Sequence, residues 1–144
     1  MTNYINTDLI LVSSADISAL AATLEHAGLY RLECQFFEST GLWHATFASD
    51  EQFSEPEQSL LRLLGVIEPL MAQIREVWDG CSERNMDVGF ECGDEPFDFH
   101  KAISNSTIGR VAATGAALNI TLYGRAPAPQ GLNTGIRSHR PATW

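Results

Sequence analysis

Asn85-Met-Asp-Val-Gly-Phe-Glu91 places an apolar residue at every even position and a polar residue or glycine at every odd one. Side chains of a β-strand point alternately to its two faces, so this period of two predicts a half-buried strand. How that strand is used depends on the elements around it. We therefore follow the chain outward from residues 85–91 in both directions.

The segment before this strand predicts an interrupted helix. Ser54-Glu-Pro-Glu57 has the pattern of a capping box, with the proline in the first turn, where its missing N–H costs little. Pro69 lies further along and removes a main-chain hydrogen bond, so we expect a kink or two abutting helices. The apolar stripe of this region recurs at steps of four and three residues and consists of Leu60, Leu64, Ile67, Met71, Ile74 and Trp78.

Two shorter segments before that helix predict a β-hairpin. Residues 30–36 alternate apolar and polar side chains, and residues 43–47 do the same after the turn Glu38-Ser-Thr-Gly41. We expect the apolar phases of both strands to face the core. Those phases consist of Tyr30, Leu32, Cys34 and Phe36 in the first strand, and of Trp43, Ala45 and Phe47 in the second.

The N-terminal region predicts a strand followed by a helix. Asp8-Leu-Ile-Leu-Val-Ser13 is apolar on both faces, which is typical of a central strand covered on both sides. Ser13 and Asp16 form the start signal of a helix, apolar residues follow at helical spacing, and Gly28 predicts its end. The order up to residue 91 is therefore β-α-β-β-α-β, which indicates an α+β fold with a ferredoxin-like core.

The chain beyond residue 91 predicts a C-terminal extension of one helix and one strand. Ser104 has the position of an N-cap, with Ile108, Val111 and Ala112 expected inward and Gly115 as the stop. Residues 118–122 then alternate as a last strand. We expect residues 1–124 to form a single α+β domain, and residues 125–144, rich in Pro and Gly and without periodicity, to form a flexible tail.

Charge is unevenly distributed along the 144 residues. The formal net charge is −9, but residues 1–124 contain all eighteen Asp and Glu and only six Lys or Arg, a formal charge of −12. Such a body repels nucleic acid and anionic membranes and attracts basic partners, although acidity also serves solubility. The N-terminus lacks the basic start of a signal peptide, and no apolar run is long enough to span a membrane. We expect a cytoplasmic protein.

The residue types that perform catalysis or bind metals have no recognisable arrangement. The three cysteines, Cys34, Cys81 and Cys92, are odd in number and lack C-x-x-C spacing, so we expect reduced thiols. No two histidines have the spacing of zinc ligands on a helix. The sequence predicts no catalytic residue, metal or cofactor. Asp94, Glu95, Asp98 and His100 could hold a divalent ion if their loop folded back, but we expect a solvated acidic turn.

The polar phases of the strands predict a surface for a partner. In a β-α-β-β-α-β fold the helices cover one face of the sheet, and the other face remains open. We expect that face to carry Arg31, Glu33, Gln35, His44, Thr46, Asp87 and Glu91. Further carboxylates follow Glu91 in the next turn and are expected close by. The predicted partner-binding set is Asp87, Glu91, Asp94, Glu95, Asp98 and Glu33.

The chain resembles bacterial families that include immunity proteins of polymorphic toxin systems. The resemblance is carried by Trp43, by Met86–Phe90 followed by Asp94–Phe99, and by the closing Gly115–Tyr123. The resemblance covers residues 8–124. It implies a non-catalytic protein that neutralises a cognate toxin, commonly through an acidic surface. The alternative is a small-molecule-sensing regulatory domain, because β-α-β-β-α-β units often dimerise through sheet edges or helices. A homodimer is therefore also left open. An enzyme ranks third, for want of positioned catalytic groups.

Overall fold

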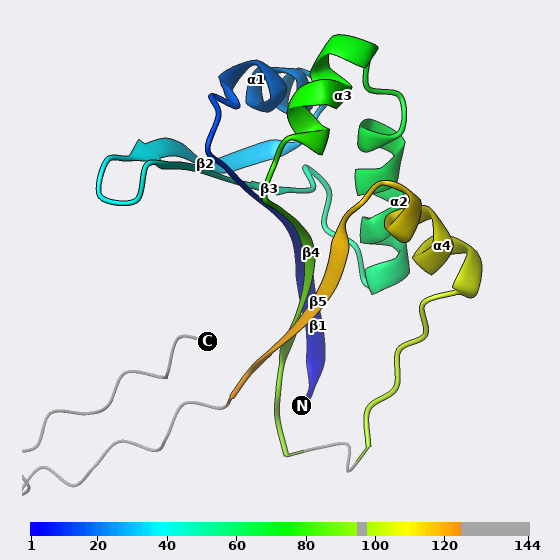
Figure 1. Cartoon of the computed structure of the whole chain (residues 1–144). Coiled ribbons are helices and arrows are strands. Elements are labelled where there is room, and N and C mark those ends of the chain that lie inside the picture. The colour runs from blue at the N-terminus through cyan, green and yellow to red at the C-terminus, as the bar shows by residue number, and fades with distance from the viewer. Residues whose placement is uncertain (95–97, 125–144) are drawn as a thin grey trace, which may run out of the picture.

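The computed structural model describes residues 1–94 and 98–124 and shows an α+β fold built on one mixed sheet (Figure 1). The predicted flexible tail, residues 125–144, and the turn residues 95–97 lie outside the described residues. The strands are β1 (Asn3–Ser13), β2 (Tyr30–Phe37), β3 (Leu42–Ala48), β4 (Glu83–Glu91) and β5 (Ala117–Tyr123). The helices are α1 (Ser18–His26), α2 (Pro56–Ile67), α3 (Ala72–Asp79) and α4 (Asn105–Ala113).

The sheet has the strand order β2-β3-β1-β4-β5, which places β1 at its centre. β1 runs antiparallel to β3 and to β4, and β2 runs antiparallel to β3. β5 runs parallel to β4, an arrangement that needs a crossover, and α4 supplies it. The predicted C-terminal helix and strand are confirmed, and the strand extends the sheet by one edge.

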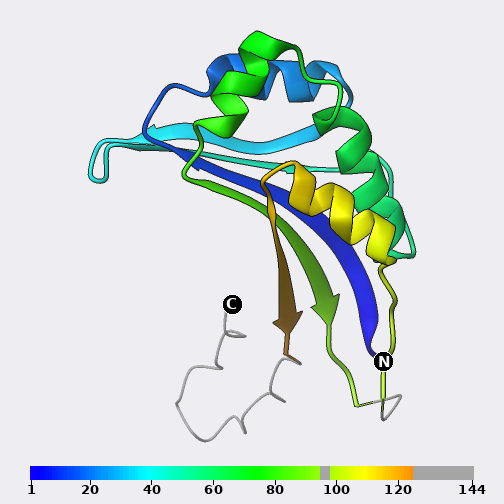
Figure 2. The ribbon, with the colours of Figure 1, turned by 45° about the vertical axis from the view of Figure 1, so that its right-hand side comes forward.

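The helices of the described chain all lie on one side of the sheet (Figure 2). β1 and β4 bend away from them, so the helices lie outside the bend and the other face, here called the open face, lies inside it. Leu9 and Leu11 are fully buried under the helices. Asp8 and Ile10 point to the open face and are only half-buried. The expectation that the first strand is covered on both sides is therefore wrong, because no helix crosses to the open face.

The helix boundaries follow the predicted stop signals more closely than the predicted starts. Gly28, after α1, has a φ of +111°, a conformation that glycine adopts without the strain a side chain would cause. The apolar stripe around Pro69 forms two helices, as expected, and Met71 is exposed at the N-cap of α3 rather than buried. The capping box at Ser54 is wrong. The N-cap of α2 is Glu55, whose side chain makes no capping hydrogen bond. The Glu57 carboxylate, which the predicted box would use to cap the helix, instead accepts from the backbone N–H of Ser104 at 2.7 Å.

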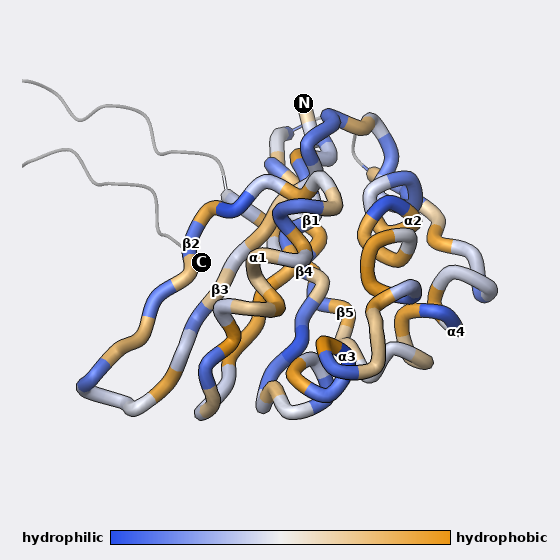
Figure 3. The backbone as a smooth tube through the Cα atoms, turned by 90° about the horizontal axis from the view of Figure 1, so that it is seen from above, coloured by the Kyte–Doolittle hydropathy of each residue, from blue (hydrophilic) through white to orange (hydrophobic). Residues whose placement is uncertain are grey.

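The core lies between the sheet and the helices, with α2 as its main apolar element (Figure 3). Five of the apolar side chains of α2 are buried there. Trp78 of α3 is fully buried, and its indole N–H donates to the carbonyl oxygen of Thr114 at 2.8 Å. In α4 the buried residues are Thr107 and Val111, so the expectation that Ile108 and Ala112 face inward is wrong.

The hairpin departs most from the predicted pattern. A register shift between Arg31 and Glu33 changes the alternation of β2, so Arg31 lies on the helix side, opposite Phe47, and not on the open face. The hairpin also projects beyond the helices (Figure 1). Phe36 near the hairpin end is 45% exposed instead of buried and packs against the Trp43 ring, at 5.6 Å between centroids. Leu32, which has no register partner at the shift, is 53% exposed.

Candidate functional site

The open face of the sheet has a one-sided charge. The strand registers place side chains of all five strands on it, and each charged group among them is a carboxylate. No Lys or Arg side chain of the described strands points to this face, where His44 is the one group that can become cationic. Its carboxylates are Asp8, Glu33, Glu83, Asp87 and Glu91, and its uncharged polar members include Asn6, Gln35, Thr46, Asn85, Asn119 and Thr121.

Two of these carboxylates face each other at the centre of the sheet. Asp8 on β1 is the direct register partner of Asp87 on β4. Like charges directly opposite on antiparallel strands destabilise a sheet. Each carboxylate has one neutral donor: the Asn6 amide lies 3.0 Å from Asp8, and the Thr121 hydroxyl lies 2.6 Å from Asp87. No cation among the described residues offsets their repulsion.

Burial raises the pKa of the Asp8 carboxyl above its ordinary value of 3.8, and the facing Asp87 raises it further, while the hydrogen bond from Asn6 opposes both. The centre of the open face thus holds negative charge at an energetic cost. A positive group placed there by a partner would remove part of that cost.

The cations of the described chain are held on the helix side or at its rim. Four of them form ion pairs: Arg31 with Glu25, Arg62 with Asp50, Lys101 with Glu55 and Arg110 with Glu68. Arg75 and Arg84 donate to main-chain carbonyl oxygens at helix ends. Acids on that side are therefore partly neutralised, whereas those of the open face are not.

The predicted partner-binding residues do not form one cluster. Asp87 and Glu91 share the open face of β4, and Glu33 lies on the same face but on β2, with β3 and β1 between. Asp94 lines a hollow on the helix side, and Asp98 is exposed in the segment before α4. Glu95 lies outside the described residues. The expectation that Asp94 lies close to Asp87 and Glu91 stays a prediction.

Sequence reasoning missed the acid at the centre of the face. Asp8 precedes an apolar run and was assigned only as the start of a strand. Its role depends on the pairing of β1 with β4, which are more than seventy residues apart in the sequence. Only an alignment of β1 with β4 in the correct register would have indicated that Asp8 faces Asp87.

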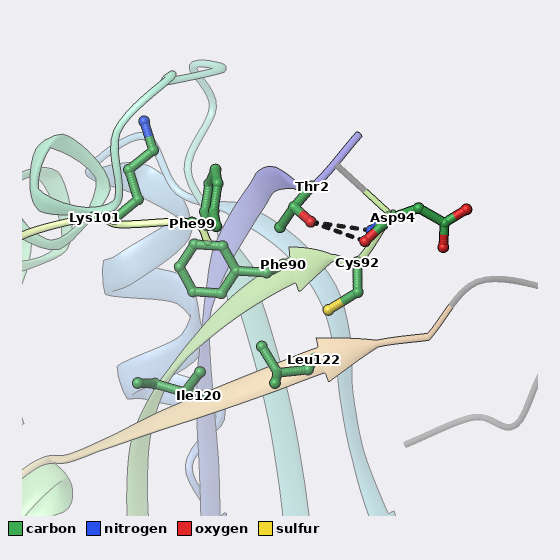
Figure 4. Close-up of a pocket in the computed structure, with 9 residues that line it drawn as sticks. Thr2, Phe90, Cys92, Asp94, Phe99, Lys101, Ile120 and Leu122 are labelled. Atoms are coloured by element: carbon green, nitrogen blue, oxygen red, sulfur yellow. Dashed lines mark hydrogen bonds between the residues drawn. The ribbon is translucent and has the colours of Figure 1, made fainter. Parts of the chain in front are cut away.

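The hollow on the helix side lies over the ends of β4 and β5 (Figure 4). It has a volume of about 460 Å³ and apolar walls. Phe90 and Phe99 meet edge to face there at 5.7 Å between ring centroids. Ile120 and Leu122 on β5 are 63% and 56% exposed, because α4 covers only the beginning of that strand. Thr2, Cys92, Gly93, Asp94 and Lys101 complete the lining.

The three cysteines of the described chain are free thiols. Burial raises the pKa of the Cys81 thiol, and it also raises that of Cys34, which disfavours the nucleophilic thiolate in both. Across residues 1–94 and 98–124, no three His, Cys, Asp or Glu side chains lie close enough to hold a metal ion. None of the helices in these same ranges is long and apolar enough to cross a membrane.

Comparison with known proteins adds no family to this geometry. No protein-family model matches the chain, and neither a curated protein nor a solved structure matches it.

Proposed function

We propose that the chain is a non-catalytic binding protein whose open face docks a basic protein, and that it acts as an immunity protein that neutralises a bacterial toxin. The observation that carries the proposal is the open face itself. The five strands together present carboxylates, amides and hydroxyls on it, and no Lys or Arg of the described strands points to it. The bend of β1 and β4 makes that face concave, which suits a convex partner.

We also infer that the first four strands form a ferredoxin-like core. Their order β2-β3-β1-β4, with each neighbouring pair antiparallel and the helices on one side, supports this inference. In such a core the face opposite the helices is available to a partner. The acids of that face provide electrostatic attraction, which mainly raises the association rate and selects partners by charge.

The test is neutralisation of a captured protein by matched charge variants. The open-face variant combines Glu33→Lys, Asp87→Asn and Glu91→Lys. The control variant combines Glu51→Lys, Glu76→Lys and Asp79→Asn, which changes the net charge equally and leaves all five open-face carboxylates in place. Wild type and both variants are used to capture proteins from the organism that encodes the chain. Each captured protein is then expressed alone and together with the chain, and growth is measured.

The proposal predicts a basic protein that wild type and control variant capture, that is toxic alone, and whose toxicity the wild type suppresses. The open-face variant should lower its association rate by about tenfold or more. Circular dichroism and thermal unfolding check that the variant folds. Equal binding by both variants, or captured proteins that are not toxic, would refute the proposal.

The hollow favours a second candidate, a small-molecule-sensing regulatory domain. Its volume of about 460 Å³ falls within the size range of ligand pockets, and two aromatic and two aliphatic side chains form its walls. This candidate predicts that an apolar fluorescent probe binds the chain and that Ile120→Glu abolishes the binding. A probe signal that is equal in the variant would rule out the hollow as its site.

A further inference from the structure

The one basic stretch of this chain follows the strand at the edge of the open face. Residues 125–144 contain Arg125, Arg137 and Arg140 and no Asp or Glu. They have a formal charge of +3, whereas residues 1–124 have −12. The segment that lies outside the described residues is therefore opposite in charge to the face described above.

The described chain ends just after β5, at the edge of that face. Tyr123, the last residue of β5, is the register partner of Glu91 and points to the open side. Its ring lies so close to Gly89 that a Cβ there would be 3.3 Å from it. Only Gly124 separates Tyr123 from Arg125. The segment consequently begins at the rim of the open face.

The length of the segment is sufficient to cross the face. Neighbouring strands are about 4.8 Å apart, so the two outer strands of a five-stranded sheet are separated by roughly 19 Å. Twenty extended residues span up to about 66 Å. Arg125 can thus reach Glu91 on the neighbouring β4, and Arg137 and Arg140 can reach the carboxylates of β4 and β1 as well as Glu33 on β2.

We propose that residues 125–144 lie across the open face of their own chain, with their arginines beside its carboxylates. A segment tethered at the rim has an effective concentration in the millimolar range, so weak, screened contacts are enough to occupy the face. It then competes with any basic protein for the same carboxylates. This competition rests on the proposed function, whereas the docking does not.

Zero-length carbodiimide cross-linking of the full chain tests the docking. The reagent joins an amine to a carboxylate that contacts it, and Lys101 is the only lysine in the sequence. Arg125→Lys, Arg137→Lys and Arg140→Lys keep the charge and introduce reactive amines into the segment. Lys101, whose amine lies 2.7 Å from Glu55, is the internal control. Cross-linked peptides are identified by mass spectrometry from a dilute mixture of isotopically light and heavy chains.

The new amines should link to Asp8, Glu33, Glu83, Asp87 or Glu91 within one chain. These links should disappear in 1 M salt, where charges are screened over about 3 Å. Three results would overturn the proposal: links mainly to helix-side acids such as Glu68 and Glu76, links only between light and heavy chains, or no new link while Lys101 still joins Glu55. Because no foreign protein is present, failure here leaves the proposed function untouched, and failure of neutralisation leaves the docking untouched.

Discussion

At the scale of single residues, the open face is stabilised against its own charge by a few neutral donors. Asp8 and Asp87 face each other, and the Asn6 amide and the Thr121 hydroxyl each donate to one of them. These hydrogen bonds lower the cost of the pair without cancelling its charge. The pair is therefore the point at which pH and substitution should affect the fold most directly.

Asp8→Asn should stabilise the fold at pH 7 by about 0.2–1 kcal/mol, because it removes a like-charge pair and leaves an oxygen that can accept from Asn6. The folded protein raises the pKa of Asp8, so its ionised form destabilises the fold above that pKa. Wild type regains this stability as the pH falls through the raised pKa toward 3.8, the ordinary value. Urea unfolding of both proteins between pH 7 and pH 3.5 measures the difference. A gap that stays constant over this range would contradict the assignment.

A second residue-scale effect concerns the buried indole of Trp78. Trp78→Phe removes the donor to the Thr114 carbonyl oxygen and leaves a buried acceptor without that partner. The expected loss is about 1–3 kcal/mol in the free energy of unfolding, measured by urea titration. Trp43→Phe is the control, since Trp43 is only half-buried and packs against the exposed Phe36 ring. Equal losses in the two variants would show that ring volume, and not the hydrogen bond, determines the effect.

At the scale of elements, Arg84 joins three parts of the fold. It lies on β4, and its guanidinium donates to the Trp78 and Asp79 carbonyl oxygens at the end of α3 and to that of Cys81 beyond it, at 2.9 to 3.0 Å. It also donates to the Gly115 carbonyl oxygen between α4 and β5, at 3.2 Å. A cation at helix C-termini compensates their partial negative charge. The Arg84 hydrogen bonds go to backbone oxygens, and its charge also opposes the burial that raises the pKa of the Cys81 thiol.

Arg84→Met should lower the free energy of unfolding by about 1.5–3 kcal/mol, because carbonyl oxygens at two helix ends lose a charged donor. Arg31→Met is the matched control: Arg31 forms an exposed pair with Glu25, and such pairs contribute about 0–1 kcal/mol. Urea unfolding of both variants tests the comparison. A loss for Arg84→Met no larger than that of the control would show that α3, α4 and β5 are held together without it.

At the scale of the whole molecule, charge and shape divide the protein into two sides. The helix side contains the core, the ion pairs and the apolar hollow, and the open side contains carboxylates without cations in the described chain. Folding requires the first side, and binding is proposed for the second. The basic residues 125–144 are proposed to lie on the second side, opposite in charge to its carboxylates.

Deletion of residues 125–144 should leave the melting temperature within a few degrees of the full chain, because exposed, screened ion pairs add little stability. The same deletion should accelerate association with an oligolysine peptide at low salt, since the open face is no longer shared. Differential scanning calorimetry and stopped-flow fluorescence measure the two quantities. A large fall in melting temperature would mean that the segment packs into the fold, and an unchanged association rate would mean that it does not cover the face.

The local sequence was enough to place the elements. A continuous apolar run located β1, alternation located the other four described strands, Pro69 located the break between α2 and α3, and Gly28 located the end of α1. Ser104 was correctly identified as the N-cap of α4, where its hydroxyl accepts from the backbone N–H of Thr107. These features depend on backbone conformations that a few neighbouring residues dictate, so they can be recognised without knowing the rest of the chain.

Tertiary structure alone decided which faces are covered and which acids meet. Arg31 changed sides because of a register shift, and Phe36 is exposed because the hairpin extends past the helices. Asp8 lies opposite Asp87 because β1 pairs with β4 in this register. Alternation within a strand shows that its two faces differ. Contacts between residues far apart in the sequence decide which face the helices cover and which strand lies alongside, and those contacts have no local pattern.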